Sequence, residues 1–158
     1  MSIAQLAVGH PDAVAVLRDY IDDVASRYYG RQATAEEIDR ALADEPSDHL
    51  DPPTGLFFVA RDGSEVVGCV GVKIVDAHTT ELTRMYVKAA ARGRGWGSRL
   101  LLTAEAAALR TGAQVMRLDT RSDLVEARGL YARHGYREVA PYGERLYADH
   151  WYEKKFSL

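Results

Sequence analysis

A glycine-rich stretch between a strand-like segment and a helical one constrains the fold more than any other feature. Residues 79–89 (TTELTRMYVKA) are rich in β-branched and aromatic residues and predict a strand. Three glycines follow in the loop 91–97, and residues 98–112 form an apolar helical run. Residues 113–120 predict another strand. Because a strand–helix–strand unit pairs its strands in parallel, the chain must form an α/β sheet around this unit.

The other segments predict antiparallel strands and further helices around this unit. We expect helices over 10–30, 34–45 and 124–135, and strands over 3–8, 55–61, 65–76, 136–142 and 149–156. Asp12 and Gly30 are the expected ends of the first helix, and Thr34 with Glu37 forms a capping box at the second. The order predicts a mixed, mostly antiparallel sheet of about seven strands flanked by helices.

Length and composition predict one ordinary globular domain. The 158 residues suit a single domain over 1–158. The net charge of −3 argues against a general nucleic-acid binder. The start of the chain does not resemble a signal peptide, no run is long enough to span a membrane, and a single cysteine, Cys69, forms no internal disulfide. We read Cys69 as a buried reduced thiol rather than a catalytic one, and expect a soluble cytoplasmic protein.

The glycine-rich loop has the chemistry of a phosphate site. A helix N-terminus presents unpaired N–H groups, and glycines let a phosphate approach them closely. Gly93, Gly95 and Gly97 supply that loop, while Arg92 and Arg94 add positive charge. Neither the P-loop pattern nor the dinucleotide G-x-G-x-x-G pattern fits the spacing. A plain connection with solvated arginines is the alternative.

At these residues the sequence resembles the GNAT acetyltransferase superfamily. Arg92, Gly95 and Gly97 match the family's Arg/Gln-x-x-Gly-x-Gly/Ala motif, which the strand-like ELTRMYV precedes. ARGLYARHGYREV is similar to the family's later helix and strand. The resemblance covers residues 55–156 well and the first 50 residues in element order only.

The resemblance implies that the chain binds acetyl-CoA as a co-substrate. It implies two neighbouring strands, 79–89 and 113–120, that splay apart to admit the pantetheine arm, and an N–H near Val87 that stabilises charge on the thioester oxygen. Backbone amides of the loop would hold the pyrophosphate. The residues expected to bind the coenzyme are Met85, Tyr86, Val87, Arg92, Gly93, Arg94, Gly95, Trp96, Gly97 and Ser98.

Two residues are candidates for catalysis. Glu81 stands where many family members carry a catalytic glutamate, and strand alternation, unless a bulge interrupts it, puts it on one face with Thr83, Met85 and Val87. It would act through ordered water, and a carboxylate paired with Arg84 or Lys73 is the alternative. Tyr131 matches the family tyrosine near the coenzyme sulfur and is the expected acid. Its alternative is packing on the sheet.

Two positions leave questions about the coenzyme site. Many family members carry Asn seven residues before this tyrosine, where this chain has Leu124, so that pantetheine contact is lost or replaced. Trp96 lies inside the loop, where it covers the phosphates or packs against the next helix. We favour packing for Trp96.

The acceptor is expected to be a small primary amine, attacked directly in a ternary complex. Residues expected near it are Tyr20, Tyr28, Tyr29, His150 and Trp151, although these also suit ordinary surface packing. The five histidines show no metal-binding spacing, so we expect no metal. An acyl-CoA sensor without turnover and acetylation of RNA or aminoacyl-tRNA are the alternative functions. A homodimer is compatible with the resemblance, but the sequence shows no interface for one.

Overall fold

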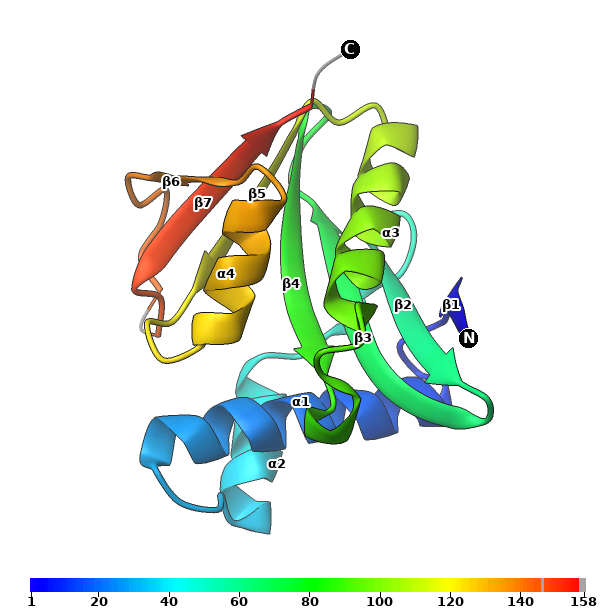
Figure 1. Ribbon diagram of the computed structural model, residues 1–158, viewed down its shortest axis with the longest axis vertical. Coiled ribbons are helices and arrows are strands. Elements are labelled where there is room, and N and C mark those ends of the chain that lie inside the picture. Colours follow the sequence, from blue (N-terminus) through cyan, green and yellow to red (C-terminus); the bar gives the residue numbers. More distant parts are fainter. Residues whose placement is uncertain (146, 157–158) are drawn as a thin grey trace.

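The computed structural model describes residues 1–145 and 147–156. A seven-stranded sheet is flanked by four α-helices and two short 3-10 helices (Figure 1). In chain order the elements are β1 (Ser2–Gln5), α1 (Pro11–Tyr29), α2 (Ala35–Asp44), η1 (Asp48–Leu50), β2 (Gly55–Asp62), β3 (Glu65–Ile74), β4 (Thr79–Val87), η2 (Ala89–Ala91), α3 (Trp96–Arg110), β5 (Val115–Thr120), α4 (Val125–Arg133), β6 (Arg137–Val139) and β7 (His150–Lys155).

The sheet has the mixed topology that the sequence predicts. Its strand order is β1-β2-β3-β4-β5-β7-β6. β4 and β5, which α3 connects, pair in parallel, and every other neighbouring pair is antiparallel. The prediction of an α/β fold with a mostly antiparallel sheet is therefore confirmed.

The helices cover both faces of the sheet. Successive side chains of a strand point to opposite faces, so apolar strands need a cover on each face. Along β2, Phe58 and Ala60 belong to the core cluster that includes α3 and α4, whereas Phe57 and Val59 belong to the cluster that includes α1. Figure 1 shows α3 and α4 side by side over one face, with α1 crossing near the far end of β4. α2 reaches the core through α1, against which Ile38 packs.

Local sequence signals set most helix ends, but the N-cap of α1 and the start of α3 differ from the prediction. Gly30 ends α1 with φ 68°, and Thr34 and Glu37 form the predicted capping box of α2. The cap of α1 is His10 rather than Asp12, because the His10 ring accepts a hydrogen bond from the Asp12 N–H while the Asp12 carboxylate pairs with Arg61. α3 begins at Trp96, two residues before the expected start, because Gly95 at φ 83° already turns the chain into the helix.

A bulge in β4 breaks the expected alternation of its side chains. Gly71 faces Thr83 and Cys69 faces Tyr86, so β4 carries one extra residue between these pairs. Arg84 has φ 54° there, in the left-handed region. After the bulge, Met85 and Val87 pack with the α3 cluster and Tyr86 with the α1 cluster. The expectation that Glu81, Thr83, Met85 and Val87 share one face is therefore wrong beyond Thr83.

Candidate active site

The two central strands separate halfway along their length. β4 pairs with β5 only from Thr79 to Glu81, opposite Val115 to Arg117. The rest of β4, residues 82–87, has no partner in β5, and Figure 1 shows the two strands diverging from this point. The backbone of this part of β4 on its β5 side is thus available to a ligand.

Two cavities open along the separated part of β4. The glycine-loop cavity is lined by β4 residues 85–87, loop residues 91–93 and 95–98, and one side of α4. The charged cavity lies toward α1 and α2 and contains Glu81, Arg84, Asp119 and Tyr131 in its lining. Val24, Met85, Leu124 and Ala127 line both cavities. Because these four residues are shared, ligands in the two cavities would meet beside Met85.

The glycine loop directs bare backbone into the first cavity. Gly93 and Gly95 have φ 79° and 83°, and a Cβ at either would meet no atom within 4 Å. The first hydrogen bond of α3 joins Arg99 N to Gly95 O, so the three preceding amides lie at the open helix end. Ser98 also bonds through Oγ to His134 Nε2, at 2.9 Å. This arrangement fits a phosphate group.

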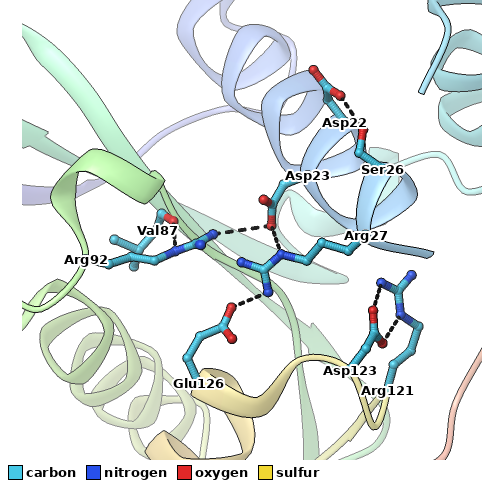
Figure 2. Close-up of polar contacts among 9 residues, drawn as sticks. All are labelled: Asp22, Asp23, Ser26, Arg27, Val87, Arg92, Arg121, Asp123 and Glu126. Atoms are coloured by element: carbon cyan, nitrogen blue, oxygen red, sulfur yellow. Dashed lines mark hydrogen bonds and ion pairs between the residues drawn. The ribbon is translucent and has the colours of Figure 1, made fainter. Parts of the chain in front are cut away.

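Arg92 is anchored by the protein itself. Its Nε donates to the Val87 carbonyl at 2.9 Å, and its Nη2 lies 3.3 Å from Asp23 Oδ2. Arg27 pairs with the same Asp23 and with Glu126, which joins α1, the glycine loop and α4 (Figure 2). Arg92 therefore fixes the end of β4, and part of its charge is already balanced by Asp23. Arg94 is exposed and lies outside the lining of the cavity.

Trp96 packs into the core and also belongs to the lining of the glycine-loop cavity. It is 2% exposed and belongs to the α3 cluster, as the packing interpretation predicts. The Arg99 guanidinium lies 4.8 Å from the centre of its ring. Leu124 caps the start of α4 and lines both cavities, which places an apolar side chain at their junction.

Glu81 is a buried carboxylate held by two arginines. It is 3% exposed, and it pairs with Arg145 and, at 3.5 Å, with Arg117 Nε. Its partners are therefore not Arg84 or Lys73, the residues expected to pair with Glu81 if it had no catalytic role. Among the described residues, Glu81 Oε2 and Arg117 Nε have no hydrogen-bond partner. A buried oxygen of this kind, beside a cavity, is suited to accept a hydrogen bond from water or from a substrate.

Asp119 forms a carboxylate pair with Glu81 around Arg145. Arg145 Nη1 lies 2.6 Å from Asp119 Oδ2 and also bonds to Glu81. Burial raises the pKa of Asp119, and the charge of Glu81 adds to that rise while Arg145 opposes it. Two carboxylates that share one cation at a cavity wall have the chemistry of a proton acceptor.

Tyr131 lies in the wall of the charged cavity. It is 5% exposed, and its ring packs 5.9 Å from that of Tyr136 and 6.2 Å from that of Tyr152. Burial raises the pKa of its phenol. The hydroxyl therefore keeps its proton at neutral pH and is available as a donor.

Comparison with known proteins identifies the family. The acetyltransferase (GNAT) family matches residues 17–136, which is more than half of the chain. The chain belongs to this family. As a GNAT acetyltransferase it is an acyltransferase.

Individual relatives agree with this assignment. An "IAA acetyltransferase" from Azospirillum brasilense is 34% identical over 118 residues, which cover 68% of this chain and 77% of that protein. The PaiA N-acetyltransferase of Thermoplasma acidophilum, solved with coenzyme A, has a TM-score of 0.77 at 22% identity, over 99% and 100% of the two chains. A GNAT family acetyltransferase from Elizabethkingia anophelis, solved with acetyl-CoA bound, has a TM-score of 0.66 at 18% identity, over 98% and 97%. At such identities the solved structures show that the GNAT fold is shared.

The aromatic residues expected near the acceptor are spread over different places. Tyr20 lines the charged cavity of the acetyltransferase, and its ring packs edge-on to Tyr86. Tyr28 and Tyr29 are exposed at the end of α1, outside the lining of both cavities. His150 and Trp151 lie on β7, also outside it, and His150 bonds to Ser122 and Glu138. The structure thus brings only Tyr20 of this set to the cavity.

Three cavity residues did not stand out in the sequence as catalytic or binding candidates. Arg117 on β5 lies opposite Glu81, and Asp119 comes two residues after Arg117. The alternating charged residues Arg117, Asp119 and Arg121 could therefore have indicated a charged face next to Glu81. Arg84 entered the expectations only as a partner of Glu81, because its bulge has no sequence signature. Arg145 arrives from the segment before β7 and has no local signal at all.

Other described groups have simpler roles in the acetyltransferase. The Cys69 thiol is buried, donates to the Arg84 carbonyl, and has its pKa raised by burial, which suits an unreactive thiol. Within residues 1–145 and 147–156, no cluster of three or more His, Cys, Asp or Glu side chains is placed to hold a metal. In the same ranges, no helix has the length and hydropathy needed to cross a bilayer.

Proposed function

We propose that the protein transfers the acetyl group of acetyl-CoA to a primary amine, by direct attack of the amine in a ternary complex. The observation that carries this proposal is the separation of β4 from β5 beside Met85, where the two cavities share four residues. Such a junction holds two reactants together, which removes much of the entropic barrier to their reaction. Relatives of the same fold were solved with coenzyme A or acetyl-CoA, which supports the choice of co-substrate.

The glycine-loop cavity is the proposed coenzyme site. The amides at the start of α3 and the bare backbone of Gly93 and Gly95 fit a diphosphate, and the side of the β4 backbone from Met85 to Val87 that β5 leaves unpaired fits the pantetheine amides. Arg92 supports this site by fixing the Val87 peptide. Bound acetyl-CoA supplies an acetyl group activated as a thioester.

The carboxylate pair Glu81 and Asp119 is the proposed proton acceptor for the amine. An alkylammonium has no lone pair, so the amine must lose a proton before it attacks. Glu81 Oε2 has no hydrogen-bond partner among the described residues and lies 3.5 Å from Arg117 Nε, while burial raises the pKa of Asp119, which favours proton uptake by that carboxylate. Tyr131 lies on α4, the helix that follows β5, and is the proposed proton donor to the leaving sulfur.

The proposal is tested by thiol release from acetyl-CoA with a panel of primary amines, alongside calorimetry with coenzyme A. We expect coenzyme binding and amine-dependent release. Glu81→Gln and Asp119→Asn should each lower kcat/KM without weakening coenzyme affinity. Binding without release for any amine would favour the acyl-CoA sensor instead, and absence of binding would overturn the proposal. Steeply salt-dependent binding to RNA would favour the nucleic-acid alternative.

A further inference from the structure

Arg84 is an unusual residue of β4 and faces the charged cavity. Among the residues that the structure describes, Arg84 is the one residue other than glycine that has a positive φ. It occupies the extra position of the bulge. Regular alternation would send residue 84 toward the α3 core, like Leu82. The bulge turns its side chain instead toward the segment between α2 and η1. Left-handed backbone in a non-glycine residue beside a cavity is a mark of a functional position.

The guanidinium of Arg84 is oriented by neutral oxygens only. Nη1 donates to Thr83 Oγ1 at 2.8 Å, and Nε donates to Ser47 Oγ at 3.3 Å. Nη2 donates to the Glu45 and Pro46 carbonyls, at 3.3 and 3.5 Å. These four contacts hold the group in place without balancing its charge.

Other arginines of the same cavity differ from Arg84 in this respect. Arg145 pairs with Glu81 and Asp119, and Arg121 pairs with Asp123. Arg84 forms no ion pair with a carboxylate of the described residues. Acidic side chains do line this cavity, including Asp44, Glu45 and Glu144, but the geometry leaves the Arg84 charge without a partner.

The charge of Arg84 acts on a neighbouring histidine of the same cavity. Burial lowers the pKa of the nearby His49 imidazole, and the charges of Arg84 and Lys73 lower it further, against the smaller opposing effects of Asp48 and Glu81. His49 and Lys73 line the same cavity. A planar guanidinium with free charge in such a place matches a carboxylate better than any neutral group.

We propose that Arg84 binds a carboxylate of the acceptor, so that the preferred substrates are amino carboxylic acids. The inference rests on the proposed function, because it assigns the acceptor of that same reaction. Arg84 directly precedes Met85, one of the four residues that line both cavities. A carboxylate on Arg84 therefore keeps the amine of a short molecule near the junction, and the cavity's other polar wall, with Glu81 and Asp119, is left for that amine.

The test compares amino acids with their own carboxamides as acceptors. The probes are L-methionine, β-alanine and 4-aminobutyrate, each beside its primary carboxamide, with acetyl-CoA in the thiol-release assay. We expect kcat/KM at least about tenfold higher for the best acid than for its carboxamide, with the difference mainly in KM. The amine of an α-carboxamide is the less basic one and loses its proton more easily, so chemistry alone would favour the opposite order.

Two substitutions of Arg84 and one control variant assign the effect. Arg84→Asn removes the charge but tolerates the left-handed backbone, so it should fold and lose the preference for acids. Arg84→Lys keeps the charge and should retain part of the preference. Arg121→Gln, which removes an arginine of the same cavity that already has a partner, should leave the preference intact. Calorimetry of the best acid on the coenzyme-bound protein should show weaker binding for Arg84→Asn.

The outcomes separate this inference from the proposed function. Equal or better use of carboxamides by the wild type, or an unchanged preference in Arg84→Asn, overturns the role of Arg84 while the acetyltransferase activity stands. Release with simple alkylamines but none of the three acids overturns it too. If the protein neither binds coenzyme A nor releases thiol with any amine, the proposed function itself fails, and the inference fails with it.

Discussion

Individual residues of the charged cavity are positioned by burial and charge rather than by their place in a motif. Glu81 and Asp119 come from different strands, and each forms an ion pair with Arg145. Tyr131 keeps its proton because burial disfavours the phenolate. Substitutions of Tyr131 and of Arg145 test these two effects.

Tyr131→Phe should lower kcat by about 10²-fold, because the substitution removes only the proposed proton donor. Coenzyme affinity, measured by calorimetry, should stay unchanged. Since burial raises the pKa of Tyr131, the wild-type rate should show no alkaline loss from this group below about pH 10. Tyr136→Phe is the matched control, because Tyr136 is a buried tyrosine of the same cluster whose hydroxyl bonds to Glu105. Equal rates for the wild type and Tyr131→Phe would remove the acid assignment.

Arg145→Gln should destabilise the fold by about 1–2 kcal/mol, because it leaves the buried Glu81 with only the more distant Arg117. It should also move the acid limb of the kcat/KM profile to higher pH, since Arg145 lowers the pKa of Asp119 and its loss removes that effect. Urea unfolding and a pH series measure the two effects. Arg18→Gln breaks an exposed ion pair and should change stability by less than about 0.5 kcal/mol. An unmoved acid limb would contradict the carboxylate-pair proposal.

Among the secondary-structure elements, the end of β4 and the start of α3 form the proposed coenzyme site. The bulge at Arg84 decides which β4 side chains face each layer, and Arg92 ties the end of β4 to α1. The glycine loop then needs left-handed backbone at two positions before α3 begins. Matched substitutions at Gly95 and Gly30 separate the need for left-handed backbone from the need for space to bind the coenzyme.

Gly95→Ala and Gly30→Ala should each cost about 1 kcal/mol of stability, because both glycines have left-handed φ and end or begin a helix. A Cβ at either position meets no protein atom within 4 Å. Only at Gly95 does that open space belong to the glycine-loop cavity, so only Gly95→Ala should weaken coenzyme A binding, by about tenfold or more. Matching coenzyme affinities in the two variants would argue against phosphate binding at this loop.

For the whole molecule, the separation of β4 and β5 sets where ligand binding adds stability. Seven strands form one sheet, yet the central parallel pair is joined over only three residue pairs. A ligand that fills the gap bridges two halves of the sheet that α3 and α4 already cover on one face. Binding should therefore act on the stability of the whole sheet.

Coenzyme A at a concentration of 100 times its Kd should raise the unfolding free energy by about 2.7 kcal/mol. In hydrogen exchange, protection should increase at the amides of β4 after Glu81 and at the start of α3. The edge strands β1 and β6 should change only as far as global stability changes. Gly95→Ala should show a smaller stabilisation at the same coenzyme concentration. Uniform protection without a local maximum at β4 would place the ligand elsewhere.

The elements, their order and the glycine loop could be predicted from the sequence, because they depend on local chemistry. Periodic apolar residues, the capping box at Thr34 and the glycine that ends α1 act within a few positions along the chain. The strand–helix–strand order then fixed the parallel pairing of β4 with β5. The Arg92, Gly95 and Gly97 motif pointed to the family in the same local way.

The charge pattern of the charged cavity depends on long-range packing and could not be predicted from the sequence. The bulge that turns Arg84, the pairing of Glu81 with Asp119 through Arg145, and the placement of Tyr20 but not Tyr28 at the cavity all join residues distant in sequence. Such contacts depend on how whole elements pack, and a single extra residue in β4 reverses which side chains face each layer. Local propensity carries no record of that packing, so the arrangement of charges in the charged cavity is visible only in the folded chain.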